Sequence, residues 1–174
     1  MRAALVSILA AITFPAAANA PDTLVPELEK RLTVGGVEKV NAYLASHWAS
    51  AMIPLNRKAA TCDTRAVRLA VRLSRSRDAR TAAAHTDSIR EALGICTGFV
   101  LSLVTREEVP KYCASVASWT VMQTVRELRR RIAAIESDDL LRAAPNAESC
   151  RAAYLHELQT TRVVLKAAPR ESSR

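Results

Sequence analysis

"TRAVRLAVRLSRSRDAR", from Thr64 to Arg80, is the stretch that decides the fold class. Its apolar residues alternate with other residues, as they do in a β-strand that buries one face. At 100° per residue the same stretch becomes an amphipathic helix, with a broad apolar face and a narrow arginine stripe made of Arg65, Arg68, Arg72 and Arg75. Because no other segment offers an evident partner strand, we interpret it as a helix and the fold as all-α.

The remainder of the chain shows apolar residues at intervals of three and four, which is typical of helices. Glycines, prolines and capping residues separate these periodic segments. We expect a loop at 54–64 and a chain reversal near residue 105. The pattern predicts a small bundle of four or five helices, at about 37–53, 64–80, 86–104, 110–135 and 147–165. A shorter helical piece at 23–32 precedes them, and a short helix or turn lies at 137–145.

The first twenty residues have the pattern of a secretory signal peptide. Arg2 precedes a charge-free run from Ala3 to Phe14, and small residues lead to a cleavage site after Ala18 or Ala20. This segment is too short for a membrane span, which needs about 20 apolar residues. We therefore expect a periplasmic or secreted protein with a signal peptide at 1–20, a helical domain at 21–166 and a flexible tail at 167–174.

Four cysteines follow the predicted signal peptide, and an even number of cysteines in an exported chain predicts disulfides. Cys96 and Cys113 lie at equal distances from the predicted reversal near residue 105. We therefore expect them to pair across an antiparallel helical hairpin, which leaves Cys62 to pair with Cys150. The sequence alone permits three connectivities.

Recognisable catalytic and cofactor motifs are missing from the sequence. The three histidines, His47, His85 and His156, do not form an H-E-x-x-H motif, and the cysteines do not form C-x-x-C. Four glycines in 174 residues include no phosphate-binding loop. We therefore predict no catalytic residues, no metal and no cofactor, and we interpret the protein as non-enzymatic.

The chain is basic, with a formal net charge of +8, and the arginine stripe is its most distinctive charged feature. Such a stripe is either a plain solvated face or a contact for phosphates, lipid head groups or an acidic protein. No aromatic residue lies between Arg65 and Arg80 to stack on bases, so we do not expect nucleic acid. We predict an acidic protein partner for the stripe and leave a homodimer open. The second basic cluster, Arg126 to Arg131, is interpreted as the exposed side of a helix.

"ICTGFVLSLV", from Ile95 to Val104, is a long uncharged stretch in the second half of the chain. Charge-free sequence extends only over 92–105, which is too short to span a membrane. We expect a buried helix and no transmembrane segment after the signal peptide. Gly94 and Gly98 lie four residues apart, so they would share a helix face and allow a neighbouring helix to approach closely.

"CTGFV", from Cys96 to Val100, follows one cysteine and precedes two others in a small exported helical chain. Over about 62–150 this pattern resembles the periplasmic immunity proteins of type VI secretion systems. The resemblance implies a protein that binds and neutralises a peptidoglycan-hydrolase effector.

Two other classes of function remain open from the sequence. One is a small secreted helical enzyme of chorismate mutase type, whose site could be imagined from Arg65, Arg68, Arg72 and Glu91, although we find no matching arrangement. The other is an envelope ligand-binding or scaffold protein.

Overall fold

The computed structural model describes residues 23–116 and 120–167 and confirms the all-α interpretation, since these residues form helices and no strand. The predicted signal peptide, residues 117–119 and the tail from residue 168 lie outside the described residues. No helix in the described part of the chain has both the length and the hydropathy of a membrane span.

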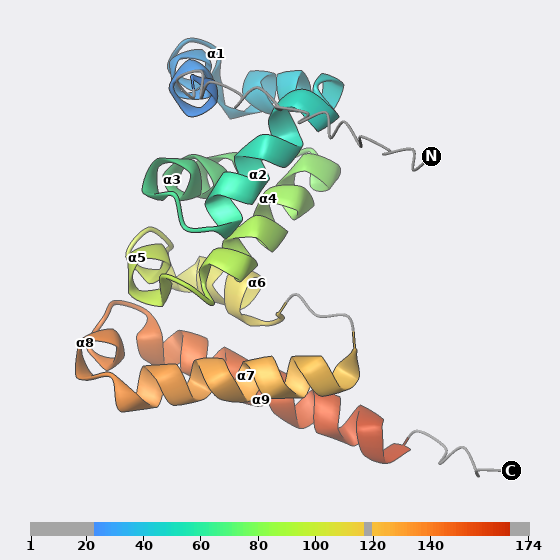
Figure 1. Ribbon diagram of the computed structural model, residues 1–174, viewed down its shortest axis with the longest axis vertical. Coiled ribbons are helices and arrows are strands. Elements are labelled where there is room, and N and C mark those ends of the chain that lie inside the picture. The colour runs from blue at the N-terminus through green and yellow to red at the C-terminus, as the bar shows by residue number, and fades with distance from the viewer. Residues whose placement is uncertain (1–22, 117–119, 168–174) are drawn as a thin grey trace, which may run out of the picture.

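The helices are stacked along the long axis of the molecule (Figure 1). α1 lies at one end, α2, α3 and α4 form the next layer, α5 and α6 follow, and α7, α8 and α9 lie at the other end. The helices span Leu24–Ser46 (α1), Ile53–Ala60 (α2), Thr64–Leu73 (α3), Ala79–Ala92 (α4), Thr97–Leu101 (α5), Val109–Cys113 (α6), Val121–Ser137 (α7), Asp139–Arg142 (α8) and Ala147–Ala167 (α9), with a π-helix at Trp48–Met52 (η1) and a 3-10 turn at Arg106–Glu108 (η2).

α3 shows why the sequence resembled a strand. Asp63 caps the helix, because its carboxylate accepts a hydrogen bond from the Ala66 amide at 2.9 Å. Every apolar side chain from Ala66 to Leu73 is buried, since α1, α2 and α4 all pack against this helix. Only the arginine side faces solvent, so the apparent alternation reflects a helix that is covered on most of its circumference.

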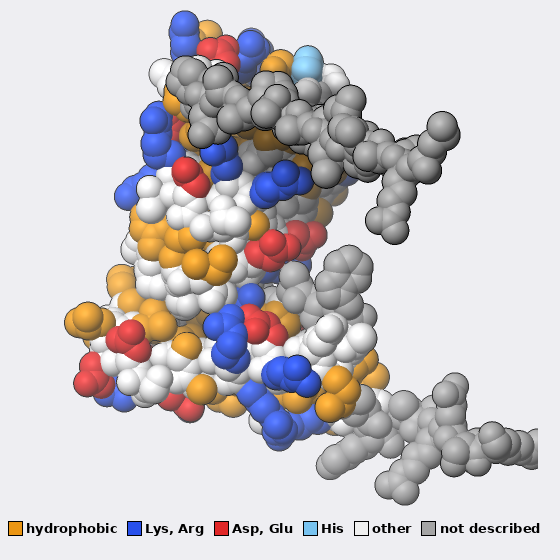
Figure 2. Space-filling view, in the orientation of Figure 1, with side chains coloured by type: hydrophobic (Ala, Val, Ile, Leu, Met, Phe, Trp, Pro, Cys, Tyr) orange, Lys and Arg blue, Asp and Glu red, His pale blue; other side chains and the backbone are white. Residues whose placement is uncertain are grey.

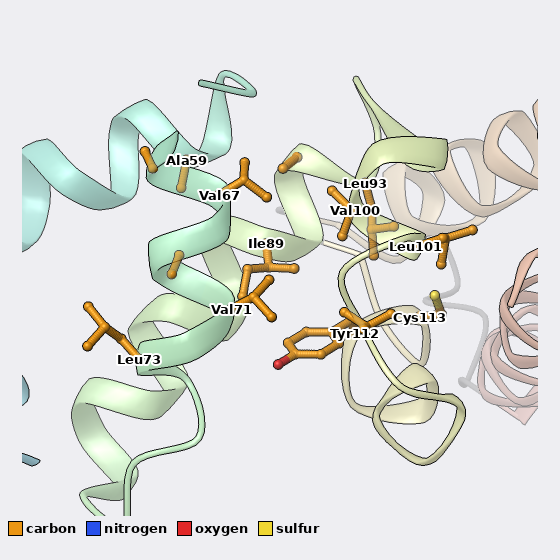
Figure 3. Close-up of a cluster of buried hydrophobic side chains, with 14 of the residues drawn as sticks. Ala59, Val67, Val71, Leu73, Ile89, Leu93, Val100, Leu101, Tyr112 and Cys113 are labelled. Carbon is orange, nitrogen blue, oxygen red and sulfur yellow. The ribbon is translucent and has the colours of Figure 1, made fainter. Parts of the chain in front are cut away.

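The apolar core is one continuous cluster, and its middle part joins α3, α4, α5 and α6 (Figure 3). Ile89, Leu93 and Val100 are fully buried there, and each contributes roughly 1.5–3 kcal/mol relative to an exposed side chain. Tyr112 is buried among them, and its hydroxyl lies 2.6 Å from the Ser74 hydroxyl. The tyrosine thus brings its polar end to a partner inside the core.

The first half of the fold confirms one predicted break and corrects another. Gly36 interrupts α1 with a φ of 74°, a conformation that favours glycine, so the predicted break is a kink within this helix. Pro54 was expected to end a helix and begin a loop at 54–64, which is wrong. It lies in the first turn of α2, where its missing amide hydrogen costs nothing, and η1 connects α1 to this helix.

The second half contains shorter helices than the sequence predicted, so the described residues form more than four or five helices. The expected helix at 86–104 is wrong at both ends: α4 begins after its cap Asp78, well before residue 86, and it ends at Ala92 before a separate α5. The expected helix at 110–135 is also divided, into α6 and α7. The helix predicted at 147–165 and the short one near 139 are confirmed as α9 and α8.

The predicted disulfide pairing is wrong. Cys62 pairs with Cys96 and Cys113 pairs with Cys150. The prediction required two long helices that reverse near residue 105, but α4 and α5 are separate and α6 packs against α9. The first bond therefore joins the end of α2 to the turn after α4, and the second joins α6 to α9.

Candidate protein-binding face

The arginine stripe lies on the solvent side of α3 and the turn that follows it. Arg65, Arg68, Arg72 and Arg75 are all exposed, as the helical interpretation predicted. Figure 2 shows basic side chains along the edge of the molecule beside α3. We refer to these four residues as the arginine face.

Two of the four arginines are held in ion pairs with the protein's own carboxylates. Arg65 pairs with Glu29 of α1. Arg75 makes a bidentate contact with Glu108, in which Nε and Nη2 donate at 2.7 and 2.9 Å. This contact lowers the pKa of the Glu108 carboxyl and raises that of Arg75. The charges of Arg65 and Arg75 are therefore largely balanced within the molecule.

Arg68 and Arg72 supply the uncompensated positive charge of the face. The Arg68 guanidinium lies 5.1 Å from the centre of the Phe99 ring, a cation–π contact that holds it toward α5. Arg72 forms no ion pair with any residue that the structure describes. Together with Arg75 and Glu29 they line a groove of about 320 Å³. Leu103 is half-buried beside them, whereas Leu69 and Val71 are buried.

The structure does not bring Glu91 to the arginine face. Glu91 lies on α4 and lines a different groove, between α4 and α2, whereas Arg68 and Arg72 line the groove beside Leu103. The carboxylates that do reach the arginine face are Glu29 and Glu108.

The two glycines predicted to pack helices do not share a helix, because Gly94 follows the end of α4 and Gly98 lies in α5. A Cβ atom at Gly94 would lie 2.9 Å from Nη2 of Arg131 and 3.0 Å from Nη2 of Arg130. A Cβ atom at Gly98 would only touch Leu141 at 3.5 Å, an ordinary contact. Gly94 therefore permits a close approach, but of arginine side chains rather than of a neighbouring helix backbone.

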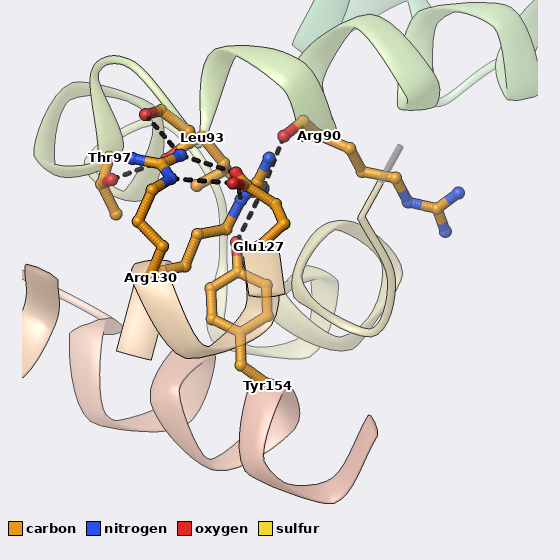
Figure 4. A network of polar contacts seen from close by, with 8 residues as sticks. Arg90, Leu93, Thr97, Glu127, Arg130 and Tyr154 are labelled. Atoms are coloured by element: carbon orange, nitrogen blue, oxygen red, sulfur yellow. Dashed lines mark hydrogen bonds and ion pairs between the residues drawn. The ribbon is translucent and has the colours of Figure 1, made fainter. Parts of the chain in front are cut away.

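These arginines belong to a polar network between α4 and the helices α7 and α9 (Figure 4). Arg131 is only 5% exposed, which corrects the interpretation of Arg126 to Arg131 as wholly exposed. It donates to Glu127 at 2.8 Å, to the Arg90 carbonyl at 2.7 Å and to the Tyr154 hydroxyl at 3.2 Å. Hydrogen bonds from Arg130 and then Arg131 lower the pKa of Glu127 to about 2.

A second buried polar cluster surrounds His85. The sequence shows this histidine but does not predict the cluster. The Asn41 amide nitrogen donates to the Leu73 carbonyl at 2.9 Å, so its side-chain oxygen is the acceptor that faces His85 Nε2 at 3.0 Å. The other ring nitrogen lies 2.8 Å from the side-chain amide of Asn56. Burial, and secondly the charge of Lys111, lower the pKa of His85 to about 4.

His85 predicts a loss of stability in mild acid. The unfolded chain binds a proton at His85 near the ordinary pKa of about 6.5, whereas the folded chain binds it only near 4, so the free energy of unfolding falls as the pH drops between these values. The expected loss is about 3 kcal/mol by pH 4. Urea unfolding of wild type and His85→Gln between pH 7 and 4 measures it.

His85→Gln should remove most of the pH dependence of the free energy of unfolding between pH 7 and 4. The control His156→Gln, at an exposed position, should leave this pH dependence unchanged. Glu127 adds a separate loss at lower pH, since its folded pKa of about 2 lies below the ordinary value of 4.5. An unchanged slope in His85→Gln would contradict the assignment.

Comparisons with protein families, with curated proteins and with solved structures give no match for this chain. Within residues 23–116 and 120–167, no group of three or more His, Cys, Asp or Glu side chains converges as metal ligands would.

Proposed function

We propose that this is an exported, non-enzymatic protein that acts by binding an acidic surface of a protein partner through the arginine face. The observation that carries the proposal is the groove lined by Arg68, Arg72 and Arg75, where Arg68 and Arg72 lack a carboxylate partner within the described residues and the half-buried Leu103 lies beside them. Positive charge of this kind steers an acidic partner into contact, and adjacent apolar surface contributes affinity.

The two disulfides support export, because disulfides persist in oxidising compartments such as the periplasm. The pattern around "CTGFV" further supports a role as an immunity protein that neutralises a cell-wall-degrading effector in the periplasm. In that role, the acidic partner is the effector itself.

The test reverses the two uncompensated charges in Arg68→Glu with Arg72→Glu. Wild type and variant are immobilised and exposed to an envelope extract, and proteins retained only by wild type are purified for kinetic measurements. We expect the association rate to fall about tenfold in the variant at about 50 mM salt, and the difference to shrink near 0.5 M salt, where screening is strong.

Arg126→Glu with Arg129→Glu is the matched control, since it makes the same change in net charge at exposed positions of α7. Equal association rates for the two double variants would contradict a specific role of the arginine face. The immunity role requires in addition that the retained protein hydrolyses peptidoglycan, and that wild type inhibits this hydrolysis more strongly than Arg68→Glu with Arg72→Glu does.

A further inference from the structure

A second groove, of about 550 Å³, lies between α2 and α4 and is held at both of its ends. At one end the disulfide between Cys62 and Cys96 ties the chain just after α2 to the turn just after α4. At the other end the Arg80 guanidinium of α4 lies 4.5 Å from the centre of the Trp48 ring, which precedes α2. The two helices therefore run parallel, and the groove is formed before any ligand binds.

The sides of the groove are two regular helix faces. α4 contributes residues at intervals of three and four, which extend about 10 Å along the helix axis. α2 contributes residues at the same intervals. The lining from α4 is Ala84, Asp87, Ser88 and Glu91, and that from α2 is Ile53, Asn56, Arg57 and Ala60.

The lining of the groove contains both small and large side chains. Ala60, Ala84 and Ser88 are small, so they leave room for another backbone to approach. Two large aliphatic side chains of the lining are exposed, Ile53 at 42% and Ile95 at 65%. Such exposed aliphatic side chains beside a concave surface are typical of an interaction site.

Carboxylates outnumber basic side chains among the described residues that line the groove, which distinguishes it from the arginine face. Asp87 and Glu91 lie one turn apart on α4, and Arg57 is the basic residue that the described part of the chain contributes to the lining, with Arg80 against Trp48 at one end of the groove. Asp87 pairs with Arg90 at 3.0 Å, while Glu91 has no ion pair among the described residues. Figure 2 shows acidic side chains over α4 and hydrophobic ones over the neighbouring α5. In a chain of net charge +8, this groove is a local site for a basic group.

We propose that the groove between α2 and α4 binds an amphipathic helix of a protein partner, which places aliphatic side chains against Trp48, Ile53 and Ile95 and a lysine or arginine beside Glu91. A third helix fits because helices pack with their axes 8–10 Å apart when small side chains lie at the contact. Helix-in-groove recognition uses anchors at three- and four-residue intervals, which match the spacing of the lining. This site lies apart from the arginine face and takes a partner of opposite charge.

The probes are two synthetic helical peptides of about four turns, in which leucine recurs every three and four positions. One carries lysine at all the other positions and its counterpart carries glutamate. Fluorescence anisotropy of the labelled peptides with the purified protein measures binding at about 150 mM salt. We expect the lysine peptide to bind about tenfold more tightly than the glutamate peptide, although the net charge of the protein favours the reverse order.

Two variants assign the binding to the groove. Ile95→Asp should weaken the lysine peptide about tenfold, and Val163→Asp, at a similarly exposed position of α9 (67% against 65%), should not. Glu91→Lys should weaken the lysine peptide and strengthen the glutamate peptide, whereas Glu157→Lys on α9 should change neither. Because Ile95 and Glu91 are exposed, far-ultraviolet circular dichroism and the thermal midpoint should remain as in wild type.

Three results would overturn the inference. The first is a glutamate peptide that binds as tightly as the lysine peptide, and the second is lysine-peptide binding that Ile95→Asp leaves unchanged. The third is a dimer in sedimentation equilibrium that Ile95→Asp dissociates, which would assign the groove to a second copy of the chain. Arg68→Glu with Arg72→Glu leaves the groove intact, so its effects are distinguishable from those of the groove variants.

Discussion

Replacing Cys113 and Cys150 by alanine is expected to lower the free energy of unfolding by about 4 kcal/mol, because the bond closes a loop with a sequence separation of 37 residues in the unfolded chain. Both cysteines are fully buried, so the replacement also removes core contacts between α6 and α9. Urea unfolding of the variant and wild type at the same pH measures the difference.

The control is Cys62→Ala with Cys96→Ala, which opens a loop of nearly equal size, with a separation of 34 residues. The two variants should lose similar stability but in different regions. Hydrogen exchange should show the lost protection in α9 when the bond between Cys113 and Cys150 is removed, and around the ends of α2 and α4 when the other is removed. A loss below about 1 kcal/mol in the first variant would contradict the expectation.

Glu127→Gln is expected to cost about 3 kcal/mol of stability, because the half-buried Glu127 carboxylate compensates the charge of the buried Arg131. Arg131 would keep its bonds to the Arg90 carbonyl and the Tyr154 hydroxyl, but it would face Arg130 with no carboxylate between them. Thermal and urea unfolding at pH 7 measure the loss.

The double variant Glu127→Gln with Arg131→Met tests the physical reason. If the cost of Glu127→Gln comes from the unpaired Arg131 charge, then removing that charge as well should recover about 1–3 kcal/mol relative to the sum of the single effects. Arg142→Met, at an exposed ion pair with Asp139, should change stability by less than about 1 kcal/mol. Strictly additive effects of Glu127→Gln and Arg131→Met would contradict a coupled pair.

The local features of the fold were predictable from the sequence where neighbouring residues determine them. The amphipathic pattern and the capping position of Asp63 are both local to α3, and the break at Gly36 follows from a glycine pair. The arginine face follows from the same periodicity, because four arginines at intervals of three and four must lie on one side of a helix.

Contacts between distant residues were not predictable in this way. The helix expected at 86–104 is interrupted where Arg130 and Arg131 approach Gly94 from 36 or more residues away. Because the sequence does not reveal this contact, the positions of Cys96 and Cys113 suggested a helical hairpin. That hairpin led to the wrong prediction of the disulfide pairing. Arg131 did carry a signal, since it lies three residues after Leu128 and four before Ile135 and therefore shares their buried face.

The charge of the arginine face also depends on contacts between distant residues. Its location was predictable, but its charge was not, because Glu29 and Glu108 pair with it from 36 and 33 residues away. The groove between α2 and α4 was hidden for a similar reason, since the sequence predicted a loop where α2 lies.

The order of the disulfides along the chain bears on how the protein can mature. The bonds join consecutive pairs of cysteines along the chain, the first to the second and the third to the fourth. A chain that enters an oxidising compartment with its N-terminus first presents Cys62 and Cys96 before either of the other two. Oxidation of thiols in their order of arrival therefore yields the native bonds directly, and thiol–disulfide exchange is not needed to reshuffle them.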